Sequence, residues 1–392
     1  MIYRCVTCDF PLEVEYDYEE VKNKISKSEI ERRKWTMWRY RELLPVEDAS
    51  NIVSLEEGGT PLLKSERLAK ELGIKKLYLK DETRNPSWSF KDRGSSVGVS
   101  KAIEIGANAV GCVSSGNMAA SMAAYAAKAG MKCFILVPSK TPVEKIVQML
   151  VSGAYVVSID APYPELCRVG LETSKRYKIY SVHNDAPMRV EGQKTSSYEI
   201  CEQLGWDTPD WIIVPTSSGG NISAQWKAWK ELYSVGFIEA LPSMVAVQAE
   251  GCCPIVKAFK QGKEKTEYFG EPKTIATAIA NPNPPSGERV LKLLKESRGV
   301  AEAVSDQEML SAQKLLARTE GLFAEPAGAA SVASLKKLLE EGKVKKDETV
   351  VCVVTGAGLK DTKSAMKVCG EALNLSSLSE YQSLLTTLLT KG

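Results

Sequence analysis

The chain carries the sequence SFKDRG at residues 89–94, in which Lys91 lies between an aromatic residue and an acid–base pair. An extended stretch at residues 77–80 precedes it, and a helix rich in small residues is expected to begin near Ser95. Most lysines at the start of a helix are surface groups. Here, however, a Ser-Ser-Gly-Asn segment follows at residues 114–117, and a glycine-rich turn follows at residues 216–221. A lysine, a phosphate-binding turn and an asparagine together are what a pyridoxal phosphate enzyme needs.

The turn at residues 216–221 reads Thr-Ser-Ser-Gly-Gly-Asn and separates an expected strand from an expected helix. Backbone N–H groups at a helix N-terminus carry partial positive charge, and small residues let a phosphate approach them closely. A generic turn between a strand and a helix looks similar, but the presence of Lys91 favours a phosphate site. No Gly-Lys-Ser/Thr ends the turn, so it is not a P-loop. The predicted cofactor-binding residues here are Ser217, Ser218, Gly219, Gly220 and Asn221.

Five motifs, in the same order along the chain, resemble those of the threonine synthases, which are tryptophan synthase β-like (fold type II) pyridoxal phosphate enzymes. They are GGTPL at residues 58–62, SFKDRG at 89–94, SGN at 115–117, EGQKT at 191–195 and TGAGLKD at 355–361. The resemblance extends over most of the chain, from about residue 55 to about residue 365. It implies that Lys91 binds pyridoxal 5'-phosphate as a Schiff base and then serves as the catalytic acid and base.

The resemblance also assigns roles around the cofactor ring. Asn117 corresponds to an asparagine that binds the ring hydroxyl, although an asparagine here could equally be a helix N-cap. Ser114 and Ser115 are the matching candidates for the substrate carboxylate. Thr355 corresponds to the hydroxyl partner of the pyridine nitrogen, although a threonine at a strand end is also common. A hydroxyl does not hold that nitrogen protonated, which favours elimination and replacement over transamination.

Arg189 matches the family arginine that binds the phosphate of the substrate, a role suited to its bidentate guanidinium group. Lys145 is a candidate second cation, and Asn221 a candidate third contact. The match weakens at residues 183–188, which look like an insertion, and in the Ser-Ser-Gly-Gly-Asn turn, where the family often has Gly-Asn-Ala-Gly-Asn. These departures surround the leaving group, so they leave the choice of substrate open. The lone His183 is interpreted as structural.

Short apolar segments rich in β-branched residues are expected to form strands, among them residues 109–113, 155–159, 211–215 and 349–354. They alternate with predicted helices, which predicts an α/β fold with two doubly wound domains and mainly parallel sheets. The resemblance places the cofactor in the cleft between the domains. The predicted parts are an N-terminal segment (1–54), a larger cofactor-binding domain (55–94 and 199–370), a smaller mobile domain (95–198) and a C-terminal helical tail (371–392). The N-terminal segment is expected to hold a strand pair within residues 4–16, one charged helix over 18–33, and surface arginines at 39 and 41.

The composition excludes several classes of partner. The chain has 51 Lys and Arg against 49 Asp and Glu, with no basic stripe, so a nucleic acid is not an expected partner. No apolar run reaches the length of a membrane span, and no signal peptide is recognised, so neither a membrane nor secretion is expected. Ten scattered cysteines, two of them Cys133 and Cys352 in apolar surroundings, favour free thiols in the cytoplasm.

Cys5 and Cys8 have the spacing of half a zinc ribbon, and the start of the chain resembles the second half of the ribbon found in some archaeal threonine synthases. A closed structural zinc site needs four ligands, so no metal is expected.

The resemblance implies conversion of O-phospho-L-homoserine and water to L-threonine and phosphate, by γ-elimination followed by β-addition of water. The alternative is a related pyridoxal phosphate lyase or β-replacement enzyme acting on O-phosphoserine, serine or threonine. A third interpretation is a non-catalytic ligand-binding paralogue, which the presence of Lys91, Asn117 and Thr355 disfavours. The expected partners are a small phosphorylated amino acid and, from the resemblance, a second copy of the chain in a homodimer.

Overall fold

The computed structural model describes residues 3–161, 163–184 and 186–389. One sheet contains β1 (Leu62–Lys64), β2 (Lys76–Asp81), β7 (Trp211–Pro215), β8 (Ser243–Ala249), β9 (Val300–Val304) and β10 (Thr349–Val354). The other contains β3 (Ala109–Val113), β4 (Lys132–Pro138), β5 (Tyr155–Ile159) and β6 (Ile179–Ser181). The strand orders are β1-β2-β10-β7-β8-β9 and β5-β4-β3-β6, and only the β1–β2 pair is antiparallel among the described strands. The prediction of an α/β fold with two mainly parallel sheets is confirmed.

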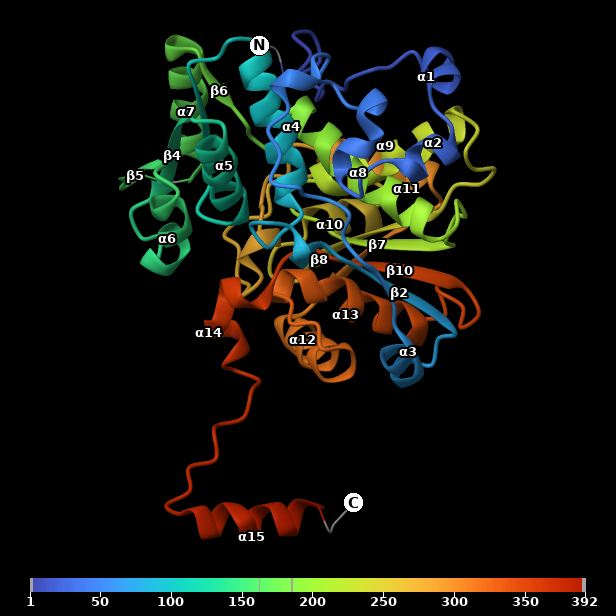
Figure 1. The fold of residues 1–392 in the computed structure, drawn as a ribbon, viewed down its shortest axis with the longest axis vertical. Helices are drawn as coiled ribbons and strands as arrows, with labels where there is room; N and C mark the ends of the chain where they lie inside the picture. The colour runs from blue at the N-terminus through green and yellow to red at the C-terminus, as the bar shows by residue number, and fades with distance from the viewer. Residues whose placement is uncertain (1–2, 162, 185, 390–392) are drawn as a thin grey trace.

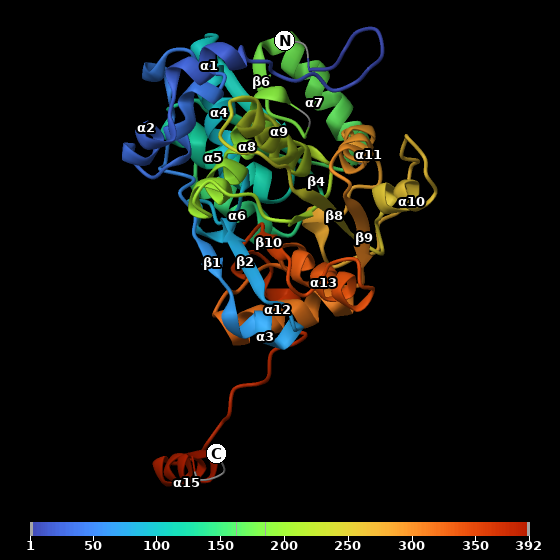
Figure 2. The same ribbon diagram turned by 90° about the vertical axis from the view of Figure 1, so that its right-hand side faces the viewer.

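Helices cover both faces of the six-stranded sheet (Figures 1 and 2). One face carries α8 (Pro187–Gln203), α9 (Gly220–Ser234), α10 (Pro254–Lys260) and α11 (Gly287–Glu296). The other face carries α3 (Glu66–Leu72), α12 (Asp306–Glu320) and α13 (Pro326–Glu340). Ile212 and Val214 of β7 are buried against the first group, and Ile213 against the second. The continuous apolar sequence of β7 therefore follows from burial on both faces.

The four-stranded sheet has its own core, to which α4 (Lys91–Glu104), α5 (Asn117–Lys128) and α6 (Val143–Val151) contribute. The last helix of this region, α7 (Tyr163–Tyr177), contacts β3, β4 and β6. Both predicted domain boundaries, after residues 94 and 198, fall inside uninterrupted helices, α4 and α8. These two helices therefore connect the regions around the two sheets.

The N-terminal segment differs from the prediction. Two short helices, α1 (Tyr18–Lys24) and α2 (Lys27–Arg32), replace the single charged helix, because Ser26 caps the second one by accepting from the backbone N–H of Glu29. The predicted strand pair is reduced to one isolated bridge between Arg4 and Pro11. Arg39 is buried and pairs with Glu202 at 2.8 Å, so its prediction as a surface group was wrong, whereas Arg41 is exposed.

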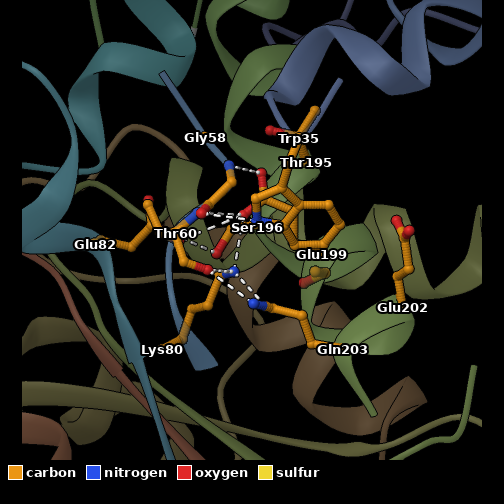
Figure 3. Close-up of polar contacts among 12 residues, drawn as sticks. Trp35, Gly58, Thr60, Lys80, Glu82, Thr195, Ser196, Glu199, Glu202 and Gln203 are labelled. Atoms are coloured by element: carbon orange, nitrogen blue, oxygen red, sulfur yellow. Dashed lines mark hydrogen bonds and ion pairs between the residues drawn. The ribbon is translucent and has the colours of Figure 1, made fainter. Parts of the chain in front are cut away.

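A buried ionic cluster joins α4 to α8 and to the end of β2. Arg93, two residues after Lys91, donates to Glu82 at 2.7 Å and to Glu199 at 2.6 Å. Lys80 donates to Glu199 and to Gln203, both at 2.8 Å, and Figure 3 shows these side chains converging beside Thr60. All four charged side chains are fully buried: Arg93, Glu82, Glu199 and Lys80. The segment that carries Lys91 is thus anchored by charge as well as by packing.

The C-terminal tail leaves the body after η5 (Gly358–Asp361) and α14 (Thr362–Ala365) and ends in α15 (Leu378–Leu389). In both views α15 lies away from the rest of the chain (Figures 1 and 2). The last three residues of the predicted tail, 390–392, lie outside the described residues. In the part of the chain that the structure describes, the helices are all too short or too polar to span a bilayer.

Candidate active site

A cavity of about 770 Å³ is lined by segments from both sheets. Residues that follow β3 meet residues that follow β7 and β10, at the carboxyl ends of the strands. This end of parallel sheets is where α/β proteins bind ligands. The structure brings every predicted site residue to this cavity: Lys91, Ser114, Ser115, Asn117, Lys145, Arg189, Ser217, Ser218, Gly219, Gly220, Asn221 and Thr355.

Lys91 is the first residue of α4, so the helix begins earlier than the predicted start near Ser95. The backbone just before it is attached to the segment that follows β10. Phe90 donates its backbone N–H to the carbonyl of Thr355 at 3.1 Å, and Ser89 forms an isolated bridge with Gly356. Lys91 and Thr355 are therefore held in the same part of the cavity, although they are far apart in the sequence.

The electrostatic surroundings of Lys91 favour a neutral amine. Burial lowers the pKa of Lys91 well below its usual range; the positive charge of Arg189 lowers it further, and Glu325 partly opposes this. A neutral amine is the form that attacks a carbonyl carbon or removes a proton. Arg189 itself is almost fully buried, and its Nη1 donates to the carbonyl of Asn184 at 2.8 Å. Lys91 can therefore act as a nucleophile or as a base.

Asn117 is the first residue of α5, and Gly116 holds the N-cap position without a side-chain hydrogen bond. The alternative interpretation of Asn117 as the N-cap was therefore wrong. Its Nδ2 instead donates to Oε1 of Glu325 at 2.9 Å. Ser114 and Ser115 lie between β3 and α5 and line the cavity beside the start of this helix. The start of α5 thus presents one amide side chain and two hydroxyl-bearing residues to the cavity.

The loop at residues 216–219 joins β7 to α9 and has the features of an anion site. Gly219 has φ +92°, and a β-carbon there would lie 2.7 Å from Cγ2 of Val290, so the backbone conformation and the space both require glycine. Ser218 Oγ accepts from Nδ2 of Asn281 at 2.8 Å. Nδ2 of Asn221 is buried without a hydrogen-bond partner among the described residues. An orphaned donor at the N-terminus of a fifteen-residue helix fits a phosphate group.

The wall opposite this loop includes α6. Lys145 Nζ donates to Oγ1 of Thr277 at 3.2 Å, and Gln148 Oε1 accepts from Nζ of Lys360 at the same distance. Burial lowers the pKa of Lys360, while the charge of Glu325 raises it. These contacts attach α6 to segments of the other sheet region across the cavity. Lys145 is thus positioned to meet a ligand from the side of the smaller sheet.

The cavity lining also includes residues that were not singled out as site residues from the sequence, among them Gln148, Glu325 and Lys360. Lys360 belongs to the TGAGLKD motif, which could have identified it. Glu325 precedes Pro326 at the start of α13 and makes no side-chain cap bond, unlike the usual acidic residue at a helix start. Gln148 is a half-buried polar residue of α6, and no motif of the sequence marks it.

Comparison with known proteins finds related enzymes that match most of the chain. The family model described as pyridoxal-phosphate dependent enzyme matches residues 53–356. The threonine synthase of Methanocaldococcus jannaschii is 48% identical over 376 residues, which cover 96% of this chain and 93% of that protein. The threonine synthase of Methanosarcina acetivorans is 46% identical over 372 residues, which cover 95% of this chain and 91% of that protein.

Solved structures show the same fold. The processed form of threonine deaminase isoform 2 from Solanum lycopersicum superposes with a TM-score of 0.70 at 22% identity. The match covers 85% of this chain and 92% of that chain. At this identity the likeness concerns the fold alone.

Proposed function

The chain belongs to the threonine synthases among the pyridoxal-phosphate dependent enzymes, and we propose that it converts O-phospho-L-homoserine and water to L-threonine and phosphate. The observation that carries this proposal is the 48% identity to a threonine synthase over almost the whole chain. The cavity supports it, because Lys91 and a glycine-containing helix N-terminus line the same space. The reaction class is that of a carbon–oxygen lyase.

The residues of the cavity fit pyridoxal 5'-phosphate. When bound, this cofactor supplies an electron sink for negative charge at Cα of an amino acid. Lys91 would hold it through its ε-amine, and the loop from Ser217 to Asn221 would bind its phosphate. Asn117 would donate to the ring oxygen, and Thr355 would meet the ring nitrogen. The unpartnered Nδ2 of Asn221 is the observation that favours a phosphate at the loop.

Lys91 would also move the protons of the reaction. A neutral amine next to the substrate can remove the proton from Cα and exchange protons at Cβ and Cγ until phosphate leaves from Cγ. Water then adds at Cβ. Burial of the amine and the charge of Arg189 both lower the pKa of Lys91 and so favour its neutral form, which supports this role. Ser114, Ser115 and the backbone N–H groups at the start of α5 would receive the substrate carboxylate.

We assign the phosphate of the substrate to Arg189, with Lys145 and Asn221 as additional contacts. Replacing Arg189 with alanine should raise the KM for O-phospho-L-homoserine by roughly ten- to a hundredfold, because a charge-assisted bidentate contact is lost. Steady-state phosphate release against substrate concentration measures this. Lys145→Ala is the comparison variant. Because the side chain of Lys145 is partly exposed, its removal should raise the KM less than removal of Arg189. An unchanged KM in the Arg189 variant would remove that residue from the phosphate site.

The proposal is tested by incubating the purified protein with O-phospho-L-homoserine. Equal amounts of phosphate and threonine are expected, with threonine identified by mass spectrometry. O-Phospho-L-serine and L-threonine are incubated in parallel, because the insertion at residues 183–188 and the altered loop border the leaving group. Asp185 of that insertion lies outside the described residues. Turnover of O-phospho-L-serine or L-threonine, with none of O-phospho-L-homoserine, would favour the alternative lyase or β-replacement activity.

We further propose a homodimer in the cytoplasm and a smaller mobile domain over residues 95–198. All ten cysteines are free thiols in the described part of the chain, and Cys133 and Cys352 are buried, which supports a reducing compartment. The exposed side chains of Leu378, Leu385 and Leu388 on α15 support a partner surface. Sedimentation of the full chain tests the dimer.

A further inference from the structure

We infer that Glu325 is a positioning residue: its carboxylate fixes the orientation of the Asn117 side chain in the cavity. The inference rests on the proposed function, because it assumes that the cofactor ring lies beside Asn117. It assigns a role to a residue that no motif of the sequence marked. Glu325 lies at the start of α13, on the side of the six-stranded sheet, whereas Asn117 begins α5 on the side of the four-stranded sheet.

The backbone of Glu325 is fixed independently of its side chain. Its N–H donates to the carbonyl of Gly356 at 2.9 Å, and Ala324 forms an isolated bridge with Ala357. Glu325 is therefore attached to the segment that begins with Thr355. The side chain is almost fully buried and lines the cavity. A carboxylate in this position has few ways to turn away from Asn117.

In the ionised form of Glu325, the hydrogen bond to Asn117 has only one polarity. An ionised carboxylate accepts and cannot donate, so the group of Asn117 that faces Oε1 of Glu325 must be the NH₂ group. This leaves the second N–H of Nδ2 available for another acceptor. If the amide were turned over, its Oδ1 would face the carboxylate, and two acceptors in contact are unfavourable. Glu325 thereby selects the orientation in which Asn117 is a donor toward the ring oxygen of the cofactor.

The surroundings of Glu325 act on its charge in both directions. Burial is the largest cause and raises the pKa of Glu325 above its usual value, while the charge of Lys360 and the hydrogen bond from Asn117 partly oppose this. Lys360 belongs to η5, so this opposing charge comes from the segment that follows β10. The site is also tightly filled: a β-carbon at Gly356 would lie 2.6 Å from Oε1 of Glu325 and 3.2 Å from Nδ2 of Asn117.

The test is a double-mutant cycle on the holoenzyme. Glu325→Gln is nearly isosteric, but a glutamine can donate as well as accept, so it no longer selects one orientation of Asn117. We expect Glu325→Gln to lower kcat/KM by roughly tenfold or more and to shift the pH at which the bound cofactor changes its absorbance. Asn117→Ala should have an effect at least as large. In the Asn117→Ala background, Glu325→Gln should add little to either quantity.

The possible outcomes distinguish an error in the role of Glu325 from an error in the proposed placement of the cofactor. If Glu325→Gln causes the same spectral shift with and without Asn117, it acts through its own charge and the inference is wrong. If Asn117→Ala leaves the absorbance of the bound cofactor unchanged, the placement of the ring beside Asn117 is wrong as well. Gly356→Ala provides a second variant that crowds the pair without changing either side chain. It should shift the pH at which the bound cofactor changes its absorbance in the same direction as Glu325→Gln does. A shift of that pH in the opposite direction would contradict the inference.

Discussion

Replacing Lys91 with alanine is expected to lower the rate of threonine formation at least about a thousandfold, because one residue supplies both the attachment point and the acid–base group. The reason lies in the cavity: Lys91 lines it from the start of α4, and burial of the amine and the charge of Arg189 together lower its pKa. Phosphate release and threonine mass are measured together. Both should fall by the same factor, since the proton transfers precede the loss of phosphate.

Lys360 provides the matched control, because it is a second half-buried lysine in the same cavity, and its pKa is also lowered by burial. After borohydride reduction and proteolysis, the cofactor should be found on the peptide that contains Lys91 and not on the one that contains Lys360. Lys91→Arg keeps a long basic side chain but removes the nucleophilic amine, so it should be as inactive as Lys91→Ala. Substantial activity in Lys91→Ala, or labelling at Lys360, would contradict the assignment of Lys91.

The sheet strands could be predicted well because buried parallel strands are short and apolar throughout. The segments expected at 109–113, 211–215 and 349–354 coincide with β3, β7 and β10, each of which is buried at all but one residue. The segment expected at 155–159 coincides with β5, which is more exposed. In contrast, β1 and α3 were not predicted, because β1 has three residues at an antiparallel edge and α3 has only seven. The break between α1 and α2 was missed because the charged pattern continues through it, although Ser26 is a capping residue. The boundary between α1 and α2 is therefore set by a capping residue, which the pattern of charged residues does not show.

The site could be predicted as a set of residues but not as a set of contacts. Lys91, Asn117 and Thr355 are marked by motifs, and the structure brings all three to the cavity. The partner of Asn117 was not predictable, because Glu325 lies in a different element and no local pattern links the two. Arg39 shows the same limit: a basic residue in a polar segment looks exposed until its distant partner, Glu202, is known. Long-range ion pairs leave no periodic signal in a sequence.

The second large effect is expected from Arg93, whose removal should destabilise the protein by about 3–5 kcal/mol. Arg93 is fully buried and donates to Glu82 at 2.7 Å and to Glu199 at 2.6 Å. Its Nη2 also donates to Oγ1 of Thr60 at 3.0 Å. Figure 3 labels the acceptors Thr60, Glu82 and Glu199. Arg93→Ala would leave two buried carboxylates sharing the single charge of Lys80. The midpoint of urea denaturation, followed by tryptophan fluorescence, measures the loss of stability.

Arg84→Ala is the control, because the Arg84 side chain is 72% exposed and its ion pair with Asp81, at 3.3 Å, should contribute about 0–1 kcal/mol.

The pH dependence of stability gives an independent test of the Arg93 cluster. Burial alone would raise the pKa of Glu199, but Arg93 and Lys80 outweigh it and hold that pKa at about 2. Because the folded-state pKa is depressed, this stabilisation is present above the unfolded value of about 4.3 and is lost as the pH falls toward 2. The stability difference between wild type and Arg93→Ala should therefore be largest near neutral pH and shrink in acid, whereas a difference that did not change with pH would indicate that Arg93 acts through packing alone.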